Sequence, residues 1–83
     1  MQIKAITIQG EAGDIEIKRV ERGALVIAND IEVLVENTAS REDLYGIAWN
    51  AAKVIWGTTK RGEPKATNSM IHDVLNEIER VAV

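Results

Sequence analysis

The hydrophobic pattern divides the chain into two parts with different periods. Residues 2–36 contain short runs in which apolar and polar side chains alternate, whereas residues 40–83 carry apolar side chains at helical spacing. A period of two is typical of strands, and a period of about 3.6 is typical of helices. The order of the two parts predicts a single α+β domain spanning 1–83, with a four-stranded antiparallel meander sheet followed by two antiparallel helices packed on one face, a ββββαα two-layer sandwich.

Turn signals separate the strands expected at 3–9, 14–20, 24–28 and 31–36. Glycine stands at both ends of 10–13, the segment 21–23 ends in glycine, and Asn29-Asp30 is a two-residue hairpin signal. Such short turns join antiparallel neighbours. The run at 24–28 is apolar on both faces, as in an interior strand. In 3–9, Ile3 and Ala5 fall on one face of a strand and Ile6 and Ile8 on the other. A bulge near Ala5 would bring all four to the same face.

The fourth expected strand alternates cleanly. Ile31, Val33 and Val35 share one face, and Glu32, Leu34 and Glu36 share the other. This pattern predicts a fourth strand, antiparallel to the one before it.

Helices are expected at about 41–56 and 68–82. Ser40 is the N-cap candidate of the first, with Asp43 three residues later, and Gly57 is its predicted left-handed C-terminal cap. Residues 57–65 form a loop, and a residue within 67–69 caps the second helix.

The first helix is unusually apolar around its circumference. At 100° per residue its apolar arc reaches roughly 220°, against roughly 140° for the second helix. Tyr45, Trp49 and Trp56, which are all of the aromatic residues in the chain, lie along one edge of that arc. Either the sheet and the second helix cover this edge, or it binds a partner. Because aromatic residues are enriched at binding hot spots, the second interpretation predicts a partner-binding edge, and the simplest partner is a second copy in a homodimer.

Composition narrows the class of protein. The 83 residues include no cysteine, which excludes disulfides and cysteine-based metal sites, and a net charge of −3 argues against a generic nucleic-acid coat. No apolar run is long enough to cross a membrane, and the first residues lack the pattern of a signal peptide. These features predict a small cytoplasmic protein without a membrane partner.

The sequence offers little for catalysis. His72 is the one imidazole and lies on the polar face of its helix, while Ser40 and Ser69 stand at cap positions. The glycines of 10–13 lack the lysine and hydroxyl of a phosphate-binding loop. We therefore predict no catalytic, cofactor-binding or metal site and no enzymatic activity. A third hypothesis for the function is a small enzyme whose active site is completed across a dimer.

A basic cluster supports an alternative function. Within residues 53–65 the basic residues are Lys53, Lys60, Arg61 and Lys65, and Trp56 lies among them. Basic side chains beside an aromatic ring can hold phosphates and stack a base. The same cations also complement the dipole at the end of the first helix without any ligand. The alternative hypothesis is therefore a nucleic-acid-binding accessory protein that uses this segment as its anion-binding site.

The predicted order of elements resembles that of some small phage-encoded inhibitors, including certain anti-CRISPR proteins. This resemblance is one of architecture and transfers no residue roles. The wide apolar arc of residues 44–56 and the absence of a catalytic constellation predict a non-catalytic protein–protein interaction module that dimerises through the aromatic edge of the first helix. The resemblance implies an inhibitor or accessory factor of phage or mobile-element type.

Overall fold

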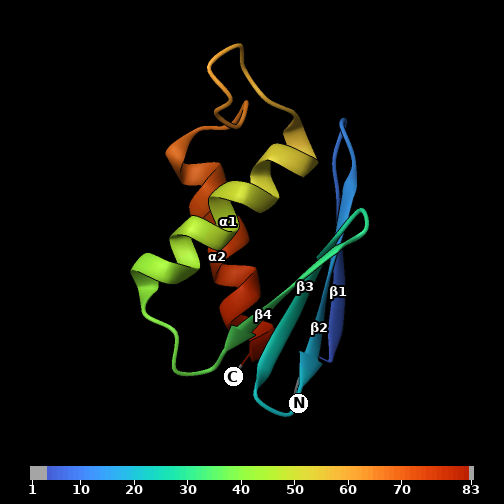
Figure 1. Cartoon of the computed structure of the whole chain (residues 1–83), viewed down its shortest axis with the longest axis vertical. Helices are drawn as coiled ribbons and strands as arrows, with labels where there is room; N and C mark the ends of the chain where they lie inside the picture. Colours follow the sequence, from blue (N-terminus) through green and yellow to red (C-terminus); the bar gives the residue numbers. More distant parts are fainter. Residues whose placement is uncertain (1–3, 83) are drawn as a thin grey trace.

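A computed structural model describes residues 4–82 and confirms the predicted fold class. Four strands precede two helices: β1 (Ala5–Gln9), β2 (Asp14–Val20), β3 (Gly23–Ala28), β4 (Ile31–Glu36), α1 (Arg41–Trp56) and α2 (Asn68–Ala82). The strands form one sheet in the order β1-β2-β3-β4, and each neighbouring pair is antiparallel. Figure 1 shows this sheet on one side of the molecule and the helices on the other.

Alternation along the strands determines which side chains enter the core. Ile17 lies opposite Val26, which lies opposite Val33, so these three residues share the helix-facing side of the sheet. The buried hydrophobic residues of the strands lie on this same face and are Ile15, Ile17, Ala24, Val26 and Val35. As predicted, β3 is an interior strand, although its Leu25 and Ile27 lie half-buried on the side without helices.

The bulge expected near Ala5 is not formed. The pairing between β1 and β2 runs without interruption from Ala5–Lys18 to Gln9–Asp14. Ile6 and Ile8 pack against the core while Ala5 is exposed. The described part of the strand therefore keeps a single parity, and Ile3, whose parity suggested the bulge, lies outside the described residues.

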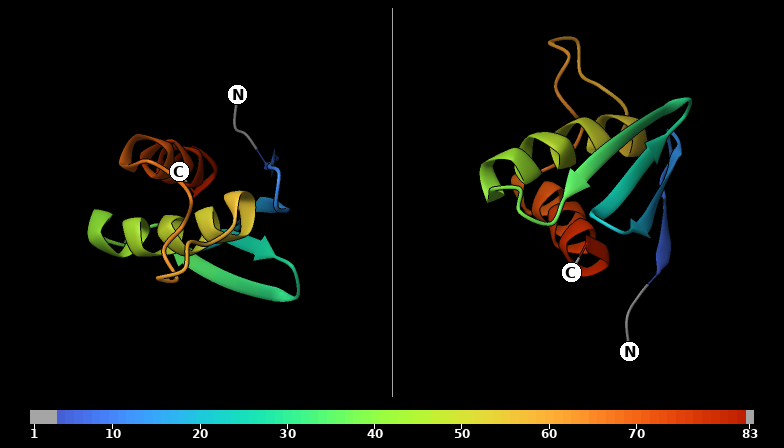
Figure 2. Two further views of the ribbon diagram at one scale, coloured as in Figure 1. Left: turned by 90° about the horizontal axis from the view of Figure 1, so that it is seen from above. Right: turned by 60° about the horizontal axis from the view of Figure 1, so that its bottom comes forward.

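The helices cover one face of the sheet, and each of them contacts β2 and β3. They run in opposite senses and cross at an oblique angle (Figures 1 and 2). Ser40 caps α1 as predicted, because its Oγ accepts a hydrogen bond from the Asp43 N–H at 3.1 Å. Thr67 does the same for α2, its Oγ1 accepting from the Met70 N–H at 3.2 Å.

The end of α1 differs in one detail from the expected left-handed cap. Gly57 has the positive φ of 84°, but its ψ of −179° is extended. Its N–H donates to the Lys53 carbonyl, and the chain then leaves directly into the loop. That loop closes through an isolated antiparallel bridge between Thr58 and Pro64 and protrudes beyond the helices (Figures 1 and 2).

The turn between β1 and β2 is fixed to the same end of α1. The Ala12 N–H donates to the Ile55 carbonyl at 3.0 Å, and Gly10 lies so close to Ile55 that an added Cβ would overlap its backbone oxygen. This contact fixes the carboxyl end of α1 at the β1–β2 turn.

Candidate functional site: an apolar groove at the β4 edge

The exposed apolar surface is concentrated on one strand. Among the described residues, the large hydrophobic side chains classed as exposed are Ile31 at 66%, Leu34 at 45% and Val33 at 38%, and all three belong to β4. Isolated exposed hydrophobic residues are common on protein surfaces, but a contiguous group marks a site of interaction. The structure therefore directs attention to β4.

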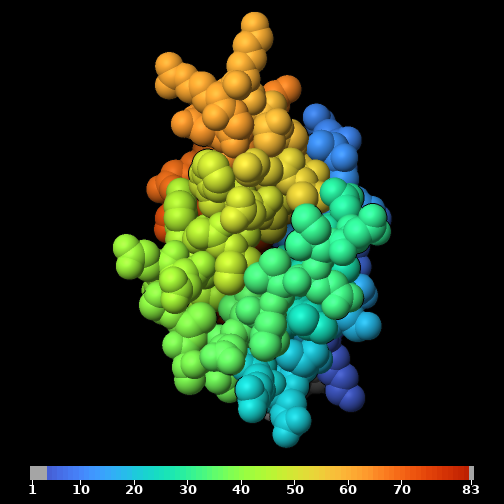
Figure 3. All heavy atoms as spheres, viewed as in Figure 1, coloured from blue at the N-terminus to red at the C-terminus, as the bar shows by residue number. Residues whose placement is uncertain are grey.

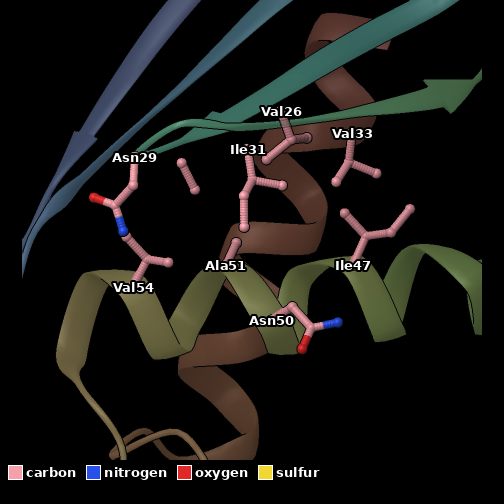
Figure 4. A pocket seen from close by; sticks show the side chains of 9 residues that line it. Val26, Asn29, Ile31, Val33, Ile47, Asn50, Ala51 and Val54 are labelled. Atoms are coloured by element: carbon pink, nitrogen blue, oxygen red, sulfur yellow. The ribbon is translucent and has the colours of Figure 1, made fainter.

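Two of these side chains, Ile31 and Val33, line a groove between β4 and α1. We call it the β4 groove; its volume is about 200 Å³. The hairpin of β3 and β4 contributes Val26, Ala28, Asn29, Ile31 and Val33, and α1 contributes Ile47, Asn50, Ala51 and Val54. In Figure 4, Ile31 and Val33 extend from the hairpin toward α1, and Ile47 extends toward them from the helix. Figure 3 shows the surface indented where α1 meets the hairpin.

The groove exists because the helix layer does not reach the start of β4. At the end of the strand, Val35 is 1% exposed, whereas Ile31 on the same face is largely open to solvent. On the helix, the short side chain of Ala51 lies between Ile47 and Val54 and leaves space that a longer residue would fill. Ile31, Val33 and Val35 all lie on the helix-facing side of the sheet, but only Val35 is fully covered.

The backbone of β4 is also open along one side. Because β4 is the last strand in the sheet order, it pairs with β3 alone. The Asn37 N–H, which continues the register, donates to the Arg22 carbonyl at 2.8 Å. Hydrogen-bonding direction alternates along an antiparallel strand, so odd-numbered residues bond to β3, while Glu32 and Leu34 direct their N–H and C=O groups away from the sheet.

Two carboxylates line this open edge. Glu32 lies opposite Ile27 and Glu36 lies opposite Gly23, so the neighbouring strand places no cation directly across from either. Within residues 4–82 neither glutamate forms an ion pair; the salt bridges found there join Arg41 to Glu79 and Arg80 to Glu77. The β4 edge thus combines an apolar side toward α1 with an opposite side that carries two carboxylates, Glu32 and Glu36, on either side of Leu34.

The three aromatic residues predicted to bind a partner are half-buried and contact their own chain. The Tyr45 hydroxyl donates to Asn68 Oδ1 at 2.6 Å, and its ring lies 5.3 Å from that of His72. The Lys53 ammonium lies 4.9 Å from the Trp49 ring centroid, a cation–π distance. All three aromatic residues pack against the core cluster.

Trp56, the last residue of α1, lies apart from the basic residues of the loop. It lines a depression with Ile6 and Ile8 of β1 and with Asp73 and Glu77 of α2. Two carboxylates beside the indole make this depression unfavourable for a phosphate.

The basic residues predicted as an anion site are not gathered on one surface feature. Lys53 lies over Trp49 on α1, whereas Lys60, Arg61 and Lys65 are exposed on the protruding loop. The loop is held by its own hydrogen bonds, since Thr59 Oγ1 accepts from the backbone N–H groups of Arg61 and Glu63. Figure 3 shows extended side chains of this loop projecting into solvent.

The described part of the chain gives little support to a metal site or to a functional role for its histidine. No cluster of three or more histidine, cysteine, aspartate or glutamate side chains is arranged there to hold a metal ion. The His72 Nδ1 lies 2.9 Å from the Asn68 carbonyl oxygen, a contact within its own helix. No described helix has the length and apolar character needed to span a bilayer.

Comparisons with known protein families, with curated proteins and with solved structures found no match to this chain. The site therefore rests on its own geometry. The sequence reasoning did not single out Ile31 and Val33, and it assigned Ile47 and Val54 to the core stripe of the first helix. The available signal was the width of the α1 apolar arc, whose aliphatic flank was assumed to be covered by the sheet.

Proposed function

We propose that the protein is a non-catalytic protein–protein interaction module that binds its partner at the β4 groove and the adjoining sheet edge. The observation that carries this proposal is the concentration of exposed hydrophobic side chains on β4. An open strand edge is a template for pairing with another chain. At about 25 cal/mol per Å², covering such apolar surface contributes favourably to association.

Site-specific photo-crosslinking tests the proposal. A photoreactive amino acid replaces Ile31 in one variant and, as the matched control, Asn76 in another, since Asn76 is exposed on α2 away from the groove. In an extract of the cells that express the protein, we expect a discrete protein adduct at position 31 and none at position 76. Excess unlabelled wild type should suppress the adduct, and excess Val33→Asp should not, because it places a charge in the groove.

The same adduct at both positions, or suppression by Val33→Asp as effective as by wild type, would contradict the proposal. Asn76→Asp, on the exposed side of α2 away from the groove, serves as the competitor control and should suppress the adduct as wild type does. Thermal unfolding of each variant verifies that it is folded.

The homodimer predicted through Tyr45, Trp49 and Trp56 stays a prediction. Sedimentation of the wild type and of Trp49→Ala tests it: a dimer that dissociates in the variant supports the aromatic edge as its interface. A monomeric wild type at high micromolar concentration rejects it. The finer description, a cytoplasmic inhibitor or accessory factor of phage or mobile-element type, likewise stays a prediction.

The nucleic-acid alternative retains one supporting observation, the exposure of Lys60, Arg61 and Lys65 on the protruding loop. Binding through these cations would depend steeply on salt, and Lys60→Ala would reduce the slope of log affinity against log salt by about 1. No binding at low salt would reject it.

A further inference from the structure

We infer that the occupant of the β4 edge is an extended segment of a partner protein, which adds to the sheet as a fifth strand and carries alternating aliphatic and basic side chains. This inference rests on the proposed function and specifies its partner. It follows from three features of β4: the direction of its free backbone groups, the apolar groove on one face and the carboxylates on the other.

The backbone supplies the hydrogen bonds. Glu32 and Leu34 direct their N–H and C=O groups outward, and both residues are exposed. The Glu36 carbonyl is used internally, since it accepts from the Ala39 N–H at 3.0 Å. The available groups therefore centre on Glu32 and Leu34, a length suited to a short extended segment.

The groove selects the side chains that face α1. Its volume of about 200 Å³ is below the roughly 300–1,000 Å³ of a typical small-molecule site. Its walls are aliphatic, with Ile31 and Val33 on one side and Ile47 and Val54 on the other. On an added strand, every second side chain would point to this side of the sheet and cover these residues. Aliphatic residues fit these positions.

The face of the sheet away from the helices favours basic side chains in the partner segment. The remaining side chains of an added strand would lie beside Glu32, Leu34 and Glu36. Opposite charges in directly facing positions stabilise a strand pair, and like charges destabilise it. Lysine or arginine in the partner segment would complement both glutamates.

The same charges disfavour a second copy as the occupant. An antiparallel two-fold pairing of β4 centred on Leu34 places Glu32 opposite Glu36 of the second copy. A pairing centred on Val33 places Glu36 opposite Asp30 of the second copy. Each arrangement repeats this contact twice by symmetry and sets like charges face to face.

Peptide titration followed by amide and methyl NMR tests the inference. The probe is a short synthetic peptide in which lysine alternates with valine, and its matched control replaces every lysine by glutamate. The lysine peptide should shift the amide signals of Glu32 and Leu34 and the methyl signals of Ile47 and Val54. The glutamate peptide should bind about ten-fold more weakly. A third peptide, methylated on the backbone nitrogens that would pair with β4, should lose binding by about ten-fold or more.

Two proline variants test the strand pairing from the protein side. Leu34→Pro removes an outward N–H and should leave the sheet folded while abolishing lysine-peptide binding. Val33→Pro removes an N–H that bonds to β3 and should lower the melting temperature clearly. Asn76→Ala, on the exposed side of α2 away from the edge, is the control variant, and it should bind the peptide as the wild type does.

The outcomes separate the two proposals. Equal binding of the methylated and unmethylated peptides, or of the lysine and glutamate peptides, overturns the fifth-strand inference while the crosslink at position 31 still supports an interaction module. A dimer in sedimentation that Leu34→Pro dissociates assigns the edge to a second copy and overturns it as well. Absence of a specific crosslink at position 31 overturns the proposed function itself, whatever the peptides do.

Discussion

The two edges of the sheet differ in how far their apolar side chains are covered, although a helix lies beside each. At the β1 edge, Trp56 lies beside Ile6 and Ile8, and Asp73 and Glu77 of α2 flank the same depression. At the β4 edge, α1 presents only Ile47, Ala51 and Val54 across the groove from the strand, with Asn50 at its margin. Beside the large Trp56 ring, Ile6 and Ile8 of the β1 edge are half-buried, whereas Ile31 and Val33 of the β4 edge stay exposed beside smaller aliphatic side chains.

The difference follows from where α1 is fixed. Its carboxyl end is tied to the β1–β2 turn through the Ala12 and Ile55 backbones and the close approach of Gly10. Because both helices contact β2 and β3, the helix layer lies over the centre of the sheet, and the start of β4 extends beyond it. An edge strand with exposed aliphatic residues tends to aggregate unless charged side chains oppose pairing with other chains. The glutamates of β4 supply such charge.

The largest expected effect comes from breaking the attachment at the β1 edge. Gly10→Ala places a methyl group against the Ile55 carbonyl oxygen and Cγ2, so the turn or the helix end must move. We expect a loss of about 2–3 kcal/mol in the free energy of unfolding, measured by urea denaturation. Gly46→Ala is the matched control, since no atom lies within 4 Å of its added Cβ on the exposed side of α1. It should stabilise the protein by about 0.5–1 kcal/mol. Similar effects of the two substitutions would refute the role given to Gly10.

A matched truncation at the two edges should give unequal results. Trp56→Ala removes a half-buried ring that packs against the core and should cost about 2 kcal/mol of unfolding free energy. Ile31→Ala, at a side chain 66% exposed, should change it by less than about 0.5 kcal/mol. The comparison fails if Ile31→Ala destabilises as much as Trp56→Ala, because β4 would then be part of the fold's core rather than an open edge.

The smallest expected effect concerns the ion pair between the helices. Arg41 Nη1 lies 2.7 Å from Glu79 Oε1, and both side chains are substantially exposed. Surface ion pairs contribute little, so Arg41→Ala should cost about 0.5 kcal/mol or less, and the difference from wild type should vanish at high salt. A larger cost that persists in high salt would contradict the small contribution given to this pair. Denaturation at two salt concentrations measures it.

The local pattern of apolar, capping and turn residues was sufficient to predict most of the fold. The helix bounds 41–56 and 68–82 agree with the structure because each helix combines a 3.6-residue apolar period with a capping side chain, Ser40 or Thr67. The two-residue turn at Asn29-Asp30 was recognisable for a similar reason, since Asn29 has the positive φ of 56° that asparagine tolerates. The register of β1 was misjudged because Ile3 suggested a change of parity.

The site required the tertiary structure. By itself, the sequence determined that β4 alternates aliphatic and acidic side chains and that α1 is apolar over most of its circumference, because both are properties of neighbouring residues. Only the folded chain decided which part of that circumference is covered. The aromatic edge carries the larger side chains, but Asn68, His72 and Lys53 contact it, whereas the aliphatic flank faces a strand that the helix layer does not reach. Coverage depends on the crossing of α1 and α2 and on the contact of Gly10 with Ile55, which join residues far apart in the chain and leave no trace in local periodicity.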